Sequence, residues 1–579
     1  MKRITCLLLS FLMVITLIGF TSCKKSDSDN EENSSEEPHP DLKIVENGVA
    51  NCRIIRSASA TSSVTELANR VSNLIASVTG ISPEVTTDYV KTGETLDHST
   101  LEILVGDTEY YESASALAGI PYGDYVVTRV DEKLVINSLS LNGLKAAITA
   151  FGKNVMLNGT KENYTVSADM LLTGTSIEIA NALPLYQGGT PVLLHEECND
   201  GQMVVIEETS EAEFDTYQTA LTTAGYSLYT HNEMANNKFA TYINDTYTVN
   251  VSYAAYETTT RIIIEPRGTL PILESENTYE KKVDASFAQL GVEFPVDGEL
   301  AIAGMCYVAQ ASDGSFIIID GGHKTDYCSK QLYDYMKKYA PDPNNIVIAA
   351  WIITHAHSDH VGAFSDFADK YADKVTLELF IANTPSDQAF IDGGIEGDCS
   401  GKNAMWTKAA ACFKGAKLIT AHVGHQYYLR DVKIEILFTT EIYTPRLINY
   451  GNTTSMVFSV EIGGQKILIL ADTTNPACNV LSQMYGNYLK SDFVQTAHHG
   501  SNTGSKAYTS LVNVYKLAAA PVVLWPCGEG IYPDHTQKDY NKALIELDTT
   551  KEIFVAGSRT VRFLFPYTVG TSGCKSILK

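Results

Sequence analysis

The stretch Thr-His-Ala-His-Ser-Asp-His at residues 354–360 decides how the C-terminal half of this chain folds. It follows the apolar run 346–353, which predicts a fully buried strand. A loop that leaves a strand end places alternate side chains on one side, so His355 and His357 can bind one metal ion. A protein core would have to give every histidine ring nitrogen a hydrogen-bond partner, which argues against a purely structural role.

The next titratable residues of the stretch, Asp359 and His360, can reach a second ion. Histidine is the commonest metal ligand, and nine of the thirteen histidines lie after residue 295. Apolar residues at positions 364, 367, 368 and 371 follow with helical spacing. We therefore expect a strand, a metal loop and a helix in this order, with one or two divalent ions, Zn²⁺ or Mn²⁺, as the cofactor.

Other strand-like runs also end in residues that suit a metal site. One ends at Asp320, a second just before Asp472, and a third just before the pair His498 and His499. Four such motifs in order along the chain carry far more weight than any one of them.

Together these motifs resemble the metallo-β-lactamase fold, an αββα sandwich with one or two metals at its strand ends. The resemblance implies a set of metal ligands, namely His355, His357, Asp359, His360, Asp472 and His498. We expect His498 to be the ligand of its pair because it comes first off the strand, with His499 as the alternative. The resemblance also places Asp320 behind the metal loop, where it supports the ligands.

Three details are similar to the ComEC-like subgroup, the metallo-β-lactamase domain of a competence protein and its stand-alone relatives. They are the tetrad HHGS at 498–501, the run NTTS at 452–455 and the late segment 521–535. The wider family has a third histidine motif where this chain has Asn452 and Ser455. The site of His355 and His357 would then be one nitrogen donor short, so we expect one metal, or two with water or Asn452 completing the shell.

Several further residues are expected to support the ligands or to contact substrate, namely Asp320, Asn452, Ser455, His499 and Ser501. We assign surface or packing roles to His422 and His425. His535, in a Tyr-Pro-Asp-His turn, is expected to contact a substrate oxyanion or to protonate the leaving group, with a surface role as the alternative.

The expected reaction is hydrolysis. A bound divalent ion lowers the pKa of its water from 15.7 to about 7 and so supplies hydroxide at neutral pH. The resemblance implies that Asp472 bridges the metals and holds the nucleophile, that Asp359 orients it, and that His535 is the third catalytic residue. It also implies a phosphodiester or another small ester as the substrate, and the missing third histidine argues against β-lactams.

The charge of the chain limits its partners. Its 579 residues include 43 Lys and Arg and 68 Asp and Glu, a formal net charge of −25. Such a chain repels a phosphate backbone at long range, which argues against extended duplex DNA as a partner. Metals at the site could still recruit a small phosphoester locally.

The first 40 residues are typical of a secreted protein. Lys2 and Arg3 precede the apolar run 4–20, and small residues lead to Cys23. This resembles a bacterial lipoprotein signal over residues 1–23, which implies a lipid on Cys23, a location at the bacterial cell surface and membrane contact through the lipid alone. An ordinary cleaved signal peptide or a single membrane anchor is the alternative. Residues 24–40, acidic and without large apolar side chains, predict a disordered tether.

The rest of the chain predicts an α/β protein with two smaller α/β or α+β domains before the sandwich. The expected boundaries are 41–173 and 174–270 for these domains, 271–294 for a linker and 295–570 for the hydrolase domain. Segments 103–108 and 122–127 and the helix that opens at Asn142 are similar to the small α/β domain preceding the barrel of family 20 and 67 glycoside hydrolases. This implies packing or glycan contact, so a surface glycan-binding lipoprotein with a secondary or degenerate hydrolase domain is the alternative function.

Overall fold

The computed structural model describes residues 40–579 except 176–177, 297–298, 302, 396, 398, 502–507, 573–576 and 579. The expected signal peptide, the lipidation site Cys23 and tether residues 24–39 lie outside the described residues. Among the described helices, none is both long enough and apolar enough to cross a membrane.

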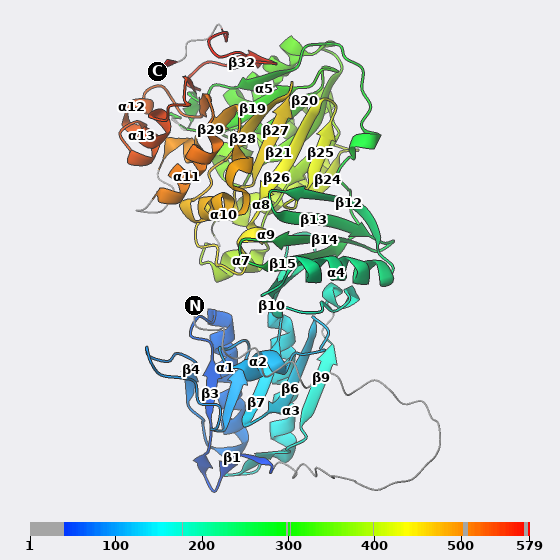
Figure 1. The fold of residues 1–579 in the computed structure, drawn as a ribbon, viewed down its shortest axis with the longest axis vertical. Coiled ribbons are helices and arrows are strands. Elements are labelled where there is room, and N and C mark those ends of the chain that lie inside the picture. Colours follow the sequence, from blue (N-terminus) through cyan, green and yellow to red (C-terminus); the bar gives the residue numbers. More distant parts are fainter. Residues whose placement is uncertain are drawn as a thin grey trace. The chain divides into compact units, whose positions relative to one another are not determined.

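The first domain is a sheet with helices packed on it, drawn in blue and cyan in Figure 1. Its elements are β1 (Leu42–Glu46), β2 (Val49–Ala50), β3 (Arg53–Arg56), α1 (Ser62–Thr79), β4 (Val85–Thr87), β5 (Glu102–Val105), α2 (Tyr111–Ser115), β6 (Asp124–Val130), β7 (Lys133–Ser138), α3 (Leu141–Asn158), β8 (Tyr164–Val166) and β9 (Leu171–Thr175). The main sheet has the order β4-β3-β5-β7-β6-β9. Helix α1 begins after Thr61, whose side chain accepts a hydrogen bond from the Val64 amide, and ends at Gly80, whose φ of 80° favours glycine.

The middle domain is an antiparallel sheet with one helix across it. Its elements are η2 (Ile179–Ala182), β10 (Thr190–Glu196), β11 (Gln202–Glu207), α4 (Glu211–Thr223), β12 (Ser227–Met234), β13 (Asn237–Ile243), β14 (Tyr247–Ala254) and β15 (Thr259–Pro266). The strand order is β10-β11-β15-β14-β13-β12. Helix α4 lies against the sheet in Figure 1. Its Phe214 and Tyr217 belong to one buried cluster with Tyr242 and Val251 of the sheet, so these residues form a core.

The C-terminal domain begins with a mixed parallel and antiparallel sheet and its helices. After η3 (Glu274–Glu276) come β16 (Ser286–Gln289), β17 (Pro295–Val296), β18 (Glu299–Leu300), β19 (Cys306–Gln310), β20 (Phe316–Asp320), α5 (Asp326–Tyr339), β21 (Ile346–Ile353), α6 (Ser358–Tyr371), η4 (Ala372–Lys374), β22 (Val375–Leu377), β23 (Leu379–Ala382), α7 (Asp387–Asp392), α8 (Cys399–Cys412) and β24 (Lys417–Thr420). The sheet order is β24-β23-β21-β20-β19-β16, and it continues to β32 (Val561–Leu564). The expected linker 271–294 therefore contains β16, a buried strand of this sheet, because Phe287 and Ala288 are core residues.

The second half of the domain repeats this plan. Its elements are β25 (Gln426–Leu429), β26 (Val432–Phe438), α9 (Thr440–Tyr443), η6 (Gly451–Thr454), β27 (Val457–Ile462), β28 (Gln465–Ile469), α10 (Asn475–Tyr485), η7 (Gly486–Leu489), β29 (Phe493–Gln495), η8 (Ala497–Gly500), α11 (Thr509–Ala518), β30 (Val522–Trp525), α12 (Tyr532–His535), α13 (Asp539–Ile545), β31 (Glu552–Val555) and β33 (Ile577–Leu578). The sheet order is β25-β26-β27-β28-β29-β30-β31-β33.

The two sheets face each other and helices cover their outer faces. Strand β20 shows why, since Ile317 and Ile319 point into the core between the sheets while Phe316 and Ile318 point to α5 and α6. Helices α10, α11 and α13 cover the other sheet and lie together in Figure 1 (orange and red). This arrangement confirms the predicted αββα sandwich, preceded by other α/β domains.

Candidate metal centre

The candidate metal centre lies where strands of the two sheets end. Asp320 ends β20, the motif of residues 354–360 follows β21, Asp472 follows β28, and the pair His498 and His499 follows β29. Strands β20 and β21 are parallel neighbours, as are β28 and β29, so the carboxyl ends of each pair lie at one edge. The chain therefore brings together the four motifs that the sequence separates.

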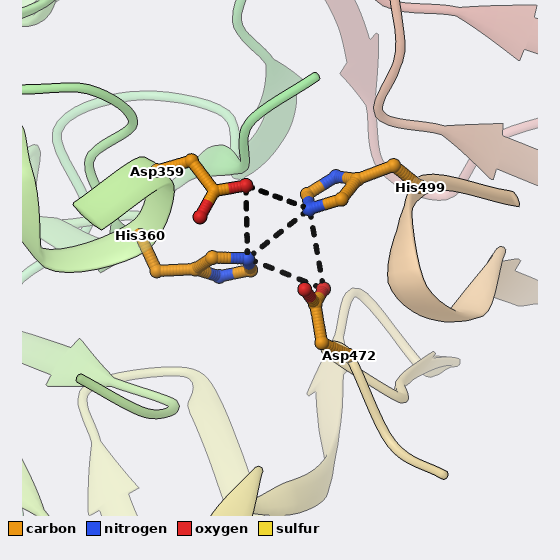
Figure 2. Close-up of side chains that lie close together, drawn as sticks. All are labelled: Asp359, His360, Asp472 and His499. Atoms are coloured by element: carbon orange, nitrogen blue, oxygen red, sulfur yellow. Dashed lines mark hydrogen bonds and ion pairs between the residues drawn. The ribbon is translucent and has the colours of Figure 1, made fainter. Parts of the chain in front are cut away.

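One group of metal-type ligands consists of Asp359, His360, Asp472 and His499 (Figure 2). His360 Nε2 lies 3.2 Å from His499 Nε2 and 3.2 Å from Asp472 Oδ1. His499 Nε2 lies 3.2 Å from Asp359 Oδ2 and 3.3 Å from Asp472 Oδ1. Two ring nitrogens and two carboxylates thus point at one small space.

Hydrogen bonds on the far side of each ring fix this orientation. His360 Nδ1 lies 2.7 Å from Asp320 Oδ2, and His499 Nδ1 lies 3.0 Å from the Pro526 carbonyl oxygen. With Nδ1–H donating in each ring, Nε2 keeps its lone pair for the centre. Asp320 also accepts hydrogen bonds from Thr354 N at 2.7 Å and Thr354 Oγ1 at 2.8 Å, so it supports the metal loop from behind.

The second group consists of His355, His357 and Asp472. His355 Nδ1 lies 3.1 Å from Thr354 Oγ1, while its Nε2 is buried without a hydrogen-bond partner among the described residues. That Nε2 lies 3.9 Å from Asp472 Oδ2. Each oxygen of Asp472 therefore faces a different group of ligands.

The electrostatics of the centre suit a cation. Burial alone would raise the pKa of Asp472, but His360 and His499 hold it well below its usual range. Burial alone would lower the pKa of His499, but Asp472 and Asp359 raise it to about 9. The carboxylates thus stabilise positive charge at this point.

The donors fit a divalent ion. An imidazole nitrogen with no partner is costly in a protein interior, and His355 Nε2 is such an atom. Imidazole and carboxylate together are ligands that Zn²⁺ and Mn²⁺ accept in proteins. The two groups share Asp472. Together they could hold one or two ions, through His355 and His357 in one group and Asp359, His360 and His499 in the other.

The other predicted residues of the late motifs lie around the centre. His498 Nε2 is 3.7 Å from Asp472 Oδ2 and 3.0 Å from Asn452 Nδ2. Ser455 is fully buried, with its amide donating to the Asn452 carbonyl, and the Ser501 amide donates to the His498 carbonyl. His499, the alternative ligand of its pair, is the one grouped with Asp359 and His360, whereas His498 lies on the other side of Asp472.

His535 ends α12 and is 5% exposed, so it is not a surface residue. Its Nδ1 is buried without a hydrogen-bond partner in the part of the chain that the structure describes. Burial and then Lys538 lower its pKa to about 4. The ring is therefore neutral at pH 7, which suits a hydrogen bond to substrate better than transfer of a proton.

His422 and His425 pack inside the molecule and not at its surface. His422 Nδ1 lies 2.7 Å from Glu441, and its Nε2 lies 3.4 Å from Glu265 of the middle domain. His425 Nε2 lies 3.0 Å from Asn250 Oδ1, also of the middle domain. These two histidines join the middle and C-terminal domains.

Thr354 and Lys538 were not among the site residues predicted from the sequence. The Thr354 hydroxyl links Asp320 to His355. Its position inside the motif at 354–360 is the feature of the sequence that could have indicated this role. Lys538 Nζ donates to the Gly500 carbonyl oxygen at 3.1 Å, next to Ser501. No spacing in the sequence indicates this contact.

One comparison with known protein families matches part of this domain. Residues 301–399 match the family described as the Metallo-beta-lactamase superfamily. No curated protein matches the chain.

Solved structures also resemble part of the chain. The metallo-β-lactamase fold protein YhfI from Bacillus subtilis is 14% identical, with a TM-score of 0.31, and the match covers 48% of this chain and 98% of YhfI. Zn²⁺-bound PqqB from Methylobacterium extorquens is 12% identical, with a TM-score of 0.31 and coverage of 48% and 99%. CmlA, a diiron β-hydroxylase from Streptomyces venezuelae, is 11% identical, with a TM-score of 0.30 and coverage of 52% and 55%. The matched family and the observed sandwich show that the C-terminal half of the chain carries a metallo-β-lactamase fold domain.

Proposed function

We propose that the C-terminal domain is a metal-dependent hydrolase that cleaves a phosphodiester or another small ester. The observation that carries this proposal is the shared carboxylate, since Asp472 presents one oxygen to each of two ligand groups. Two ions bound there would lower the pKa of a coordinated water and stabilise charge on the attacking and leaving oxygens.

The protein residues have separate roles in this reaction. Asp320 and the Pro526 carbonyl orient His360 and His499, so the ligands need little rearrangement when ions bind. Asp359 is partly exposed and can orient a nucleophile as well as bind an ion. His535, whose lowered pKa leaves its ring neutral at pH 7, is the residue that we assign to a hydrogen bond with a substrate oxygen.

A small ester fits the surface charge better than a long nucleic acid. The densest lysine run near the centre includes Lys402 and Lys408, and both are paired with carboxylates, Asp387 at 2.6 Å and Asp369 at 2.6 Å. A duplex would need a basic stripe of free cations. Among the described residues near His499, Lys538 is a cation placed to attract one phosphate group.

We also propose that a lipid on Cys23 anchors the protein at the outer side of a bacterial membrane. The support is the order of basic, apolar and small residues before Cys23 and the acidic tether after it. Mass spectrometry of the mature N-terminus should find a diacylated Cys23, and an unmodified Cys23 would contradict the anchor.

The reaction is tested with a panel of bis-p-nitrophenyl phosphate, nucleotides, a lactone and a β-lactam, each with Mn²⁺ or Zn²⁺. The protein should hydrolyse a phosphodiester or ester without oxygen or a reductant, which separates hydrolysis from oxygen chemistry. His360→Ala should abolish turnover, while His231→Ala, which removes an exposed histidine, should not. Turnover that survives His360→Ala, or metal-loaded protein inert on the whole panel, would contradict the proposal.

A further inference from the structure

A cavity of about 790 Å³ lies between helix α5 and strand β32 of the C-terminal domain (Figure 1). Arg562, which lines it, has its Nη2 atom 3.5 Å from Oε1 of Gln310. Gln310 is paired with Phe316 at the start of β20, whereas Asp320 ends that strand at the candidate metal centre. Four residues of strand span about 13 Å. The cavity is therefore separate from the metal centre.

Aromatic and apolar side chains form much of the cavity wall. Tyr335 and Tyr339 of α5 have ring centres 4.8 Å apart, and Leu564 of β32 is 53% exposed. Tyr567 also lines the cavity, and because its hydroxyl donates to Glu552 at 2.6 Å, its ring is the part left for a ligand. A cavity of this size with apolar walls and a few polar groups is typical of small-molecule sites.

The polar group that stands out in the cavity is the guanidinium of Arg562. It is half-buried, its Cζ lies 4.3 Å from the centre of the Tyr339 ring, and among the described residues no carboxylate pairs with it. Arg261 and Arg430, the other arginines of the middle and C-terminal domains that are not exposed, each lie 2.7 Å from a glutamate oxygen. A cation removed from water is costly unless it is paired. Arg562 is thus placed to pair with an anion from outside the chain.

The other charges of the cavity do not neutralise this cation. Two cations, Lys338 and Arg562, line it together with one carboxylate, Asp334. Asp334 forms an ion pair with Lys330, which is not part of the lining. The lining therefore has an excess of positive charge on a chain whose net charge is −25.

The Tyr335 hydroxyl lies next to this guanidinium. Tyr335 is 7% exposed, and neither its hydroxyl nor Arg562 Nε has a hydrogen-bond partner among the described residues. Burial raises the pKa of Tyr335 to about 12, while the neighbouring Arg562 and Ser286 act in the opposite direction. The hydroxyl therefore keeps its proton at pH 7. Two buried donors without an acceptor lie side by side, behind the outer guanidinium nitrogens that a ligand reaches first.

We propose that this cavity binds a small organic molecule with one carboxylate and an aromatic or apolar body. The planar fork of Arg562 binds the carboxylate through two parallel N–H···O bonds, and the rings of Tyr335, Tyr339 and Tyr567 contact the body. One carboxylate matches the small excess of positive charge, whereas a phosphate monoester carries about 1.5 to 2 negative charges at pH 7. This site is additional to the proposed hydrolase centre and does not depend on it.

The test is a calorimetric titration of the metal-loaded full chain with 2-naphthoate, cyclohexanecarboxylate and hexanoate. Each carboxylate is matched with its neutral amide, and 2-naphthyl phosphate tests the larger charge. Arg562→Gln removes the charge, Arg562→Lys keeps the charge without the fork, and Leu564→Trp narrows the cavity from an exposed position. Arg559→Gln, which removes an exposed arginine nearby, is the control. Carboxylates also bind metal ions, so the difference between wild type and each variant is the measure.

Wild type should bind at least one of the carboxylates, with the matching amide bound at least about tenfold more weakly. Arg562→Gln should weaken binding by about 10–100-fold, the range for a hydrogen bond to a charged group, and Arg562→Lys should weaken it less. Leu564→Trp should weaken binding as well, and Arg559→Gln should bind like wild type.

No saturable binding of any carboxylate, or affinities that Arg562→Gln and Leu564→Trp leave unchanged, would overturn the site. Equal or tighter binding of the amides or of the phosphate would overturn the assigned ligand class. Thermal unfolding without ligand checks that each variant is folded, and Leu564→Trp keeps the test decisive should Arg562→Gln unfold.

Discussion

At the scale of single residues, the centre is marked by left-handed backbone conformations at strand ends. Asp320, which contacts His360, has a φ of 56°, Ala471, which precedes Asp472, has a φ of 48°, and the adjacent His498 and His499 are also left-handed. Each non-glycine residue in this region costs about 1–3 kcal/mol. The surrounding hydrogen bonds offset that cost, and the best example is Asp320, which bonds Thr354 and His360 at once.

We predict that Asp320→Asn weakens metal binding by about 10–100-fold, because an amide oxygen accepts the hydrogen bond from the His360 ring less strongly than a carboxylate does. Competition with a chromogenic chelator measures this change. The control Asp326→Asn alters an exposed carboxylate of α5 that pairs with Lys370 and should bind metal like wild type. Equal affinities for Asp320→Asn and Asp326→Asn would contradict the supporting role.

Most residues that the structure brings together at the candidate centre were predicted from the sequence, and the reason is local. Asp359 and His360 follow a recognisable buried strand within one short motif, so a single strand end positions them. The roles of His498 and His499 could not be separated in this way, because the direction of each ring depends on φ angles that the sequence does not reveal. His535 could not be placed either, since its burial arises from packing of α12 and α13.

At the scale of elements, the middle domain holds the loop that leads to Asn452. Arg261 of β15 is buried and donates to the Thr444 carbonyl oxygen at 2.8 Å, and Glu257 lies 2.9 Å from Arg446. The sequence predicted separate domains here, and the contacts were not predictable because their partners lie far apart in the chain. For the same reason, the sequence could not decide between a surface and a packing role for His422 and His425, and the structure shows packing.

We predict a pH-dependent contribution of His422 to this contact. Burial alone would lower its pKa, but Glu441 and Glu265 raise it well above 6.5. A raised folded-state pKa means that the stabilisation is fully present below about pH 6.5 and is lost as pH rises through the folded-state value.

His422→Gln should therefore lower the free energy of unfolding by about 1.5–3 kcal/mol at pH 6, the range for hydrogen bonds to charged groups. The difference from wild type should shrink in the alkaline range. Thermal unfolding of both proteins from pH 6 to pH 10 measures it, with His231→Gln as the exposed control. A difference that stays constant with pH would refute the charged state of His422.

At the scale of the whole molecule, the chain is strongly acidic, and the positive charge that the proposed reaction needs would come from bound ions. The net charge of −25 argues against extended nucleic acid, whereas ions held by Asp472 would supply positive charge at the proposed ester site. The sandwich was predictable because its strands are continuous apolar runs ending in polar motifs. The start of the domain was not, because β16 pairs with β32 near the far end of the chain.

We predict that removing metal destabilises the C-terminal domain. An ion at about 100 times its Kd adds about 2.7 kcal/mol, so chelation should lower the Tm by about 5–10 °C per site. Calorimetry with and without a chelator measures the shift. Identical unfolding of metal-loaded and chelated protein would show that no ion binds the folded state preferentially.

The most direct test of the account measures bound metal and phosphodiester hydrolysis together, for wild type and Asp472→Asn. Wild type should bind two ions and turn over bis-p-nitrophenyl phosphate only when metal is present. Asp472→Asn lacks the carboxylate that serves both sites, so its turnover should fall by several orders of magnitude. A wild-type protein that cannot be loaded with metal, or turnover that Asp472→Asn leaves unchanged, would contradict the account.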